Sequence, residues 1–129
     1  MTKKEQAKAY HEKGFNCAQS VALPFCEELG MPLQAAMKAL EGFGAGMGDR
    51  MQTCGALSGA VFVAGLKHSD CNLDAPASKA ATYKLCGGIC QAFKEKCGST
   101  VCQEIKELSH LSCPQCIALG IELAENISR

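Results

Sequence analysis

The chain has no tryptophan, and aromatic residues make up only 5% of its 129 residues. This scarcity argues against the stacked aromatic platforms that bind single-stranded nucleic acid. The formal net charge is zero, because thirteen basic residues are balanced by thirteen acidic ones. Without a basic or acidic excess, nothing favours attraction to nucleic acid or to a charged membrane surface. We therefore expect no nucleic-acid partner.

Long hydrophobic runs are absent as well. The uncharged stretch at 51–66 is too short, and too polar at its start, to cross a bilayer. Residues 1–6 lack the apolar core of a signal peptide. We therefore expect a cytoplasmic protein without a membrane partner.

Ten cysteines are far more than a cytosolic protein of this size normally contains. Thiols stay reduced in the cytosol, so a framework of disulfides is a poor explanation for them. Metal binding or redox chemistry is the better interpretation.

The chain predicts helices and no strands. Its apolar residues are mostly Ala, Leu and Cys rather than strand-favouring types, and no hairpin signal is convincing. Helical periodicity with start and stop residues predicts these segments: 3–13, 16–29 with a bend at Pro24, 31–43, 54–66, 76–96, 100–109 and 112–127. We expect one all-α domain over 1–129, a compact bundle of about six to seven helices.

The central helix of this bundle should follow a glycine-rich loop. Glycines at 42, 44, 46 and 48 predict a tight, ordered turn. In the uncharged helix that follows, glycines and alanines at i, i+4 form a flat face for close packing: Gly55, Gly59, Ala60 and Ala64. No strand precedes the loop and no Walker lysine follows it, so we expect it to pack beside Cys54 or wrap a cofactor rather than bind a nucleotide.

Four cysteines share one local position, the first turn of a predicted helix behind a capping residue: Cys17, Cys54, Cys102 and Cys113, behind Asn16, Thr53, Thr100 and Ser112. The unpaired N–H groups and the positive end of a helix favour a thiolate there. If the four helix starts converge, the pocket suits a metal–thiolate or iron–sulfur assembly, with Cys116 as a substitute ligand.

Other cysteines support other interpretations. Cys113 and Cys116 form a Cys-x-x-Cys dithiol at a helix start, although the strand that precedes such a motif in thioredoxins is missing. Zinc is an alternative, but structural zinc sites commonly pair two short Cys-x-x-Cys units and this chain has one. Cys86, Cys90 and Cys97 continue an apolar stripe, so we expect them to pack in the core.

Several ordered motifs resemble the C_GCAxxG_C_C family of redox-active proteins. The resemblance rests on Gly14-Phe15-Asn16-Cys17-Ala18-Gln19, the glycines of 42–48, Cys54-Gly55-Ala56-Leu57-Ser58-Gly59, Gly98-Ser99 with Cys102, and Cys113. It implies a redox role with a bound cofactor. The chain is also distantly similar to the helical, cluster-bearing part of split-Soret cytochromes, although Ile117 after Cys116 excludes a Cys-x-x-Cys-His haem attachment.

The leading interpretation is a redox protein that holds an iron–sulfur cluster or another metal through Cys17, Cys54, Cys102 and Cys113. Its role would be electron transfer or redox sensing without substrate turnover, with a redox partner protein that the sequence does not identify. The first alternative is a thiol–disulfide oxidoreductase in which Cys113 attacks and Cys116 resolves. The second is a cofactor-free, cysteine-rich interaction domain, and a homodimer is compatible with each.

Overall fold

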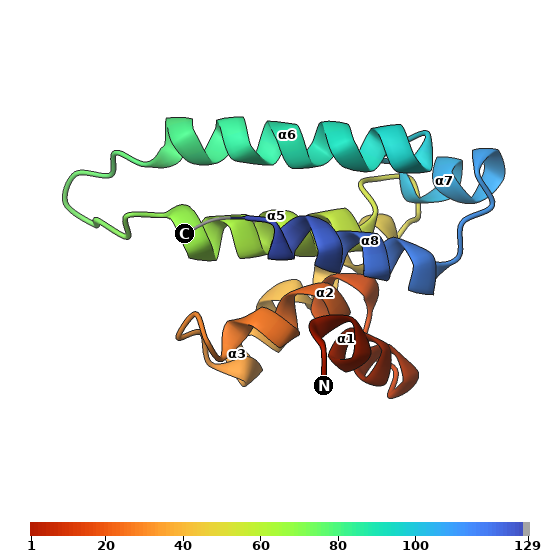
Figure 1. Ribbon diagram of the computed structural model, residues 1–129, viewed down its shortest axis with the longest axis horizontal. Coiled ribbons are helices and arrows are strands. Elements are labelled where there is room, and N and C mark those ends of the chain that lie inside the picture. The colour runs from red at the N-terminus through yellow and green to blue at the C-terminus, as the bar shows by residue number, and fades with distance from the viewer. Residues whose placement is uncertain (128–129) are drawn as a thin grey trace.

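The computed structural model describes residues 1–127, and these are organised in helices (Figure 1). In chain order the elements are α1 (Lys3–Glu12), α2 (Cys17–Cys26), α3 (Leu33–Leu40), the short 3-10 helix η1 (Glu41–Phe43), α4 (Gly44–Met47), α5 (Gly55–His68), α6 (Lys79–Cys97), α7 (Cys102–Leu108) and α8 (Cys113–Glu125). Within 1–127 the β pairing is limited to one isolated bridge, between Thr53 and Val101. The prediction of an all-α fold is confirmed.

Helix α5 lies in the middle of the molecule. In Figure 1, α6 runs along one side of α5 and α8, while α1, α2 and α3 lie on the opposite side. Helix α5 packs against α2, α6 and α8, and its Ala56, Ala60 and Ala64 are completely buried. This is the expected central helix rich in glycine and alanine.

Two glycines set how closely the central helices approach each other. A Cβ atom on Gly59 would lie 2.7 Å from the carbonyl oxygen of Ala18 in α2. A Cβ on Gly120 of α8 would lie 2.8 Å from the carbonyl oxygen of Ala56. Real Cβ atoms do not approach backbone oxygens so closely, so α2, α5 and α8 cross at this spacing only because these positions lack side chains.

Capping residues start three of the helices. The side chains of Thr2, Asn16 and Ser112 each accept a hydrogen bond from the backbone N–H three residues on, and the side chain at that position accepts one from the backbone N–H of the capping residue. These capping boxes satisfy N–H groups that a helix start leaves unpaired. The caps predicted at Asn16 and Ser112 are confirmed.

The caps predicted at Thr53 and Thr100 are wrong. Both residues lie in extended segments that pair with each other: the N–H of Cys54 donates to the carbonyl of Thr100 at 2.8 Å, and the N–H of Cys102 donates to the carbonyl of Gln52 at 2.9 Å. Neither α5 nor α7 has a side-chain cap bond. Pairing between segments distant in sequence replaces the local cap, and it places the starts of α5 and α7 side by side.

The glycine-rich loop forms η1 and then α4, which is a left-handed turn. Ala45 (φ 51°, ψ 43°) and Gly46 (φ 57°, ψ 51°) have left-handed backbones, and the N–H of Gly48 donates to the carbonyl of Gly44 at 3.0 Å. Such a backbone costs a residue other than glycine roughly 1–2 kcal/mol. A Cβ on Gly46 would lie 2.7 Å from the Cβ of Cys102. The turn is therefore packed tightly against the start of α7.

Three helix boundaries differ from prediction by three residues. Helix α3 ends at Leu40, where η1 follows, instead of reaching residue 43. Helix α2 ends at Cys26 instead of reaching residue 29, because the N–H of Met31 turns back to the Cys26 carbonyl. Helix α6 begins at Lys79 rather than 76, since the carboxylate of Asp70 accepts the N–H of Ala77 and holds that segment in a loop. Within 1–127 no helix is both long and apolar enough to cross a membrane.

Candidate redox site

A cavity of about 210 Å³ lies where the starts of α2, α5, α7 and α8 meet. Five cysteines line it: Cys17, Cys54, Cys102, Cys113 and Cys116. All four cysteines expected at helix starts are therefore brought to one place, together with the substitute ligand. Each belongs to a different helix start, and Cys116 lies one turn into α8.

Close backbone packing makes this convergence sterically feasible. A Cβ on Gly55, the residue after Cys54, would lie 3.2 Å from the Cβ of Cys17 and 3.1 Å from the carbonyl oxygen of Phe43. The start of α5 thus reaches the start of α2 because Gly55 has no side chain. Cys54 and Gly55 are adjacent, so the thiol of Cys54 lies next to a point where the backbone of α5 approaches α2 closely.

The five thiols differ in access. Cys54, Cys102 and Cys116 are only 5%, 8% and 4% exposed. Cys17 and Cys113 are half-buried. All five are free thiols in this structure. A molecule entering the cavity would therefore meet Cys17 and Cys113 more readily than the other three.

Cys17 and Cys113 are hydrogen-bonded to each other. This bond is the largest influence on both: it lowers the pKa of Cys113 to about 5, although burial opposes the shift, and Lys106, His11 and Arg50 lower it further. The same bond, with burial and the nearby sulfur charges, raises the pKa of Cys17 well above its usual range. The pair therefore contains a Cys113 thiolate that accepts a hydrogen bond from the Cys17 thiol.

Cys54 and Cys116 form a second pair of the same kind. The hydrogen bond from Cys116 is the main cause that lowers the pKa of Cys54 to about 7, and the backbone N–H groups of Ala56 and Leu57 add to it against the effect of burial. The pKa of Cys116 is raised by the bond to Cys54 and by burial. The N–H groups at the start of α5 thus favour the thiolate of Cys54, as expected for a helix N-terminus.

Two further thiols lie at or near the cavity: Cys102 lines it, and Cys97 lies in the core. Burial is the main cause that raises the pKa of Cys102, and the charge of Cys54 adds to it. Cys97, the last residue of α6, is completely buried, and its thiol is hydrogen-bonded to Cys116. Sequence periodicity assigned Cys97 to the core alone. Its packing role holds, but its sulfur also contacts the site.

Three basic side chains lie around the thiols: His11, Arg50 and Lys106 line the same cavity. The Nδ1 of His11 lies 3.2 Å from the carbonyl oxygen of Phe15; a carbonyl only accepts, so Nδ1 carries the hydrogen. Sequence reasoning missed all three residues. Lys106 was the one with a local signal, because it follows Cys102 by four residues on the same helix face.

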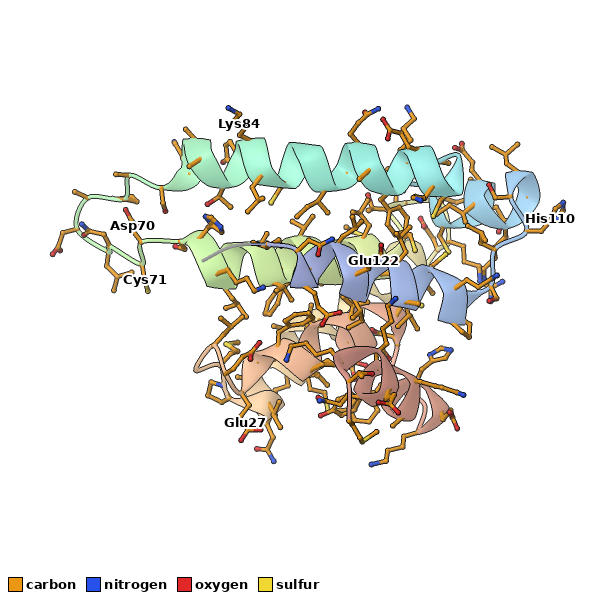
Figure 2. All side chains as sticks on the ribbon, viewed as in Figure 1. Glu27, Asp70, Cys71, Lys84, His110 and Glu122 are labelled. Carbon is orange, nitrogen blue, oxygen red and sulfur yellow. The ribbon has the colours of Figure 1, made fainter. Side chains whose placement is uncertain are left out.

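The other cysteines lie outside the cavity lining. The Cys26 thiol is buried and donates to the carbonyl of Ala22 at 3.3 Å, while Cys86 and Cys90 are half-buried on α6. Figure 2 shows Cys71 on the loop between α5 and α6, at the opposite end of the molecule from His110. Within 1–127 no three His, Cys, Asp or Glu side chains are grouped as ligands of one metal ion.

Comparison with known proteins places this site in a family. No curated protein and no solved structure matches the chain, so the similarity to split-Soret cytochromes stays a prediction. The model of one family matches residues 15–127, a range that includes every cysteine of the cavity. The chain belongs to this family, which is described as "Putative redox-active protein (C_GCAxxG_C_C)".

Proposed function

We propose that this protein carries out its redox role through thiols, with Cys17 and Cys113 interconverting between dithiol and disulfide. The observation that carries the proposal is that the two half-buried thiols of the cavity, Cys17 and Cys113, line it together. The hydrogen bond between them is the main cause that lowers the pKa of Cys113, which favours its thiolate. A thiolate is the species that attacks a disulfide, and a second thiol in contact is what releases the product. Cys54 and Cys116 form a second, more buried couple.

The two sulfurs of the first couple have different roles. Cys113 is the attacking group, because it is the thiolate of the pair. Cys17 keeps its proton chiefly because it donates to the negative charge of Cys113. Once Cys113 is bound in a mixed disulfide, that charge is gone and the pKa of Cys17 falls. Cys17 then loses its proton, attacks Cys113 and closes the disulfide.

This pairing differs from the one expected from the Cys-x-x-Cys motif. The motif places Cys116 three residues after Cys113 and made it the expected resolving thiol. The sulfur contacts favour Cys17 as the partner of Cys113 and Cys54 as the partner of Cys116. We therefore assign the resolving role to Cys17.

Disulfide mapping tests the assignment. The fully reduced protein is treated anaerobically with one equivalent of a mild disulfide oxidant, and its peptides are analysed by mass spectrometry. We expect the Cys17–Cys113 bond first and the Cys54–Cys116 bond with more oxidant. A first bond between Cys113 and Cys116 would restore the motif-based pairing. Cys86→Ser is the matched control, since this thiol lies outside the cavity lining.

An iron–sulfur cluster is the second candidate, favoured by the number of cysteines around one cavity. Two thiols suffice for disulfide chemistry, whereas five line this space. The donor set fits a cluster, because it is all sulfur and is flanked by helix-start N–H groups. Cys17, Cys54, Cys102 and Cys113 would hold it, with Cys116 as the substitute, and a cluster there would supply one-electron transfer. A single zinc ion fits less well, since no three donors within 1–127 are grouped around one point.

Anaerobic reconstitution separates the two candidates. Protein incubated with iron and sulfide is desalted and analysed for iron, acid-labile sulfide and visible absorption. Stoichiometric iron that Cys54→Ser abolishes would establish the cluster, because a serine hydroxyl is a harder and less acidic ligand. Colourless protein without iron, whose thiols still form the mapped disulfides, would establish the thiol mechanism. Protein that does neither would be the cofactor-free interaction domain.

The surroundings of the protein follow from the same chemistry. We propose a reducing, cytoplasmic setting, because all ten cysteines are free thiols. A redox partner protein would reduce the Cys17–Cys113 disulfide again.

A further inference from the structure

We propose that the cavity is selective for small anionic disulfides, which Arg50 and Lys106 guide to the sulfur of Cys113. This inference rests on the proposed thiol mechanism and names the class of substrate for it. The inference is carried by the position of two permanent cations, Arg50 and Lys106, which line the same cavity as the two most accessible thiols, Cys17 and Cys113.

The basic side chains of the cavity come from separate parts of the chain. His11 belongs to α1, Arg50 to the segment before α5, and Lys106 to α7, yet all three line the cavity with Cys113. Within 1–127 the residues that line it include no aspartate or glutamate. An anion entering the cavity would therefore meet positive charge without a nearby acidic side chain on its wall.

Acidic groups lie close to both cations along the chain, and each accepts a hydrogen bond from a group other than Arg50 or Lys106. On α7, the carboxylate of Glu104 accepts the Ser99 hydroxyl at 2.6 Å, and that of Glu107 accepts the Gln103 amide at 2.9 Å. Beside Arg50, the carboxylate of Asp49 accepts the N–H of Met51 at 2.8 Å. None of these bonds neutralises Arg50 or Lys106.

Neither cation takes part in the ion pairs of the described chain. For residues 1–127 these are Lys3 with Glu28 at 3.2 Å and Lys4 with Glu122 at 3.8 Å. Arg50 and Lys106 therefore keep their charge available for a ligand.

The backbone of Arg50 is held in place on both sides. Its N–H donates to the carbonyl of Ala45 at 2.9 Å, and its carbonyl accepts the N–H of Gln103 at 2.9 Å. Its φ of 66° is left-handed, a conformation that a residue other than glycine keeps only where the surroundings enforce it. The left-handed turn and α7 thus fix the base of this side chain beside the thiols.

Cavity size limits the substrate. Pockets for drug-sized ligands usually enclose about 300–1,000 Å³, and this cavity encloses about 210 Å³. It therefore admits the sulfur end of a small disulfide, while charged carboxylates at the ends of that molecule stay near Arg50 and Lys106 at the opening.

The reaction balances without a further oxidant. The Cys113 thiolate attacks one sulfur of the disulfide, forms a mixed disulfide and expels the other half as a thiolate. The expelled thiolate takes the proton of Cys17 and becomes a thiol. The Cys17 thiolate then attacks the sulfur of Cys113, closes the Cys17–Cys113 disulfide and releases the half that was bound there as a thiolate. The two protein sulfurs lose two electrons and the small disulfide gains them.

Three disulfides of similar size and different charge test the proposal: dithiodipropionate, a dianion; hydroxyethyl disulfide, which is neutral; and cystamine, a dication. Their second-order rates with the reduced protein are measured at low salt. We expect the dianion-to-dication rate ratio to fall about tenfold in Arg50→Gln/Lys106→Gln, at the lower end of electrostatic steering effects. Any change in thiol reactivity alters all three rates alike and cancels in the ratio.

Lys79→Gln/Lys84→Gln is the matched control, because it removes the same charge from α6, where Figure 2 shows Lys84 on the outer side. Its ratio should equal that of the unmodified protein. Salt offers a test without substitution: high salt should lower the dianion rate and raise the dication rate. Equal ratios in both double variants, or a ratio insensitive to salt, would overturn the proposal while leaving the thiol mechanism standing.

A second measurement, the alkylation rate of Cys113, distinguishes failure of the thiol mechanism from failure of anion selection. The ratio of alkylation rates with iodoacetate and iodoacetamide at Cys113 reports local charge without any disulfide exchange. If no disulfide reagent reacts and this ratio still depends on Arg50 and Lys106, the thiol mechanism fails and anion selection survives. If disulfides form and both ratios ignore the two cations, anion selection fails alone.

Discussion

Cys17, the first residue of α2, and Cys113, the first residue of α8, line one cavity, and a hydrogen bond between their side chains is the main cause that raises the pKa of Cys17 and lowers that of Cys113. Lys106, His11 and Arg50 lower the pKa of Cys113 further, so the proton that the two residues share stays on Cys17. This asymmetry distinguishes an attacking sulfur from a resolving one.

The pH dependence of Cys113 should reveal the bond from Cys17. The pKa of Cys113 lies near 5, below its usual value, so the thiolate is present above pH 5 and is lost on acidification below it. In Cys17→Ala the largest cause of this shift is removed, and the midpoint of alkylation by iodoacetamide should move to higher pH. Timed alkylation followed by peptide mass spectrometry measures it. A midpoint that stays near 5 would show that the cations alone lower the pKa, and Cys90→Ala is the control.

Cys97 should differ from the other cysteines of its helix. It is completely buried, whereas Cys86 and Cys90 are half-buried. Cys97→Ala should lower the free energy of unfolding by on the order of 1 kcal/mol, and Cys86→Ala by less. Because Cys97 contacts Cys116, its loss should also change the alkylation profile of Cys54. Thermal and urea unfolding give the first result, and an unchanged Cys54 profile would return Cys97 to a purely packing role.

Close helix crossing predicts opposite effects for two glycines. Gly59→Ala should destabilise the fold by about 1–3 kcal/mol, because the new Cβ would press on the backbone of α2 and not on a flexible side chain. Gly87 lies within α6 with nothing within 4 Å of an added Cβ. Gly87→Ala should therefore stabilise by about 0.5–1 kcal/mol through helix propensity alone. Urea unfolding compares them, and equal effects would contradict the crossing.

Asn16 should contribute more to stability than an ordinary cap. Its side chain accepts the N–H of Gln19 at 2.8 Å and donates to the carbonyl of Glu41 at 2.9 Å, so it ties the start of α2 to η1. Asn16→Ala should cost about 1–2 kcal/mol. Thr2→Ala removes the exposed capping box of α1 and should cost less. If the two costs are equal, the tie to η1 adds nothing.

Much of the fold is determined locally and was predictable. Asn16 and Ser112 begin helices because their side chains bond N–H groups three residues away, and the spacing of Gly55, Gly59 and Ala60 marks a buried face. These relationships lie within a few residues of each other, so the sequence alone expresses them. The same locality identified Cys17, Cys54, Cys102 and Cys113 as thiols at helix starts.

Only the tertiary structure decided which thiols meet. Thr53 and Thr100 look like local caps, yet Thr53 forms a bridge with Val101, and the carbonyl of Thr100 accepts the N–H of Cys54. Cys113 lies three residues from Cys116 but contacts Cys17, and Cys97 follows the core stripe of its helix but reaches the site. The approach of the helix starts depends on Gly46, Gly55 and Gly59, whose missing side chains matter only against a neighbouring helix. The sequence by itself determined that thiols lie at four helix starts. The thiolate expected at each start is favoured at Cys54 and Cys113, whose pKa values are lowered. The hydrogen bond to Cys113 and burial instead raise the pKa of Cys17, and burial and the charge of Cys54 raise the pKa of Cys102. Helix packing decided that those starts surround one cavity, because the distance between two helix ends depends on every contact that holds the helices together.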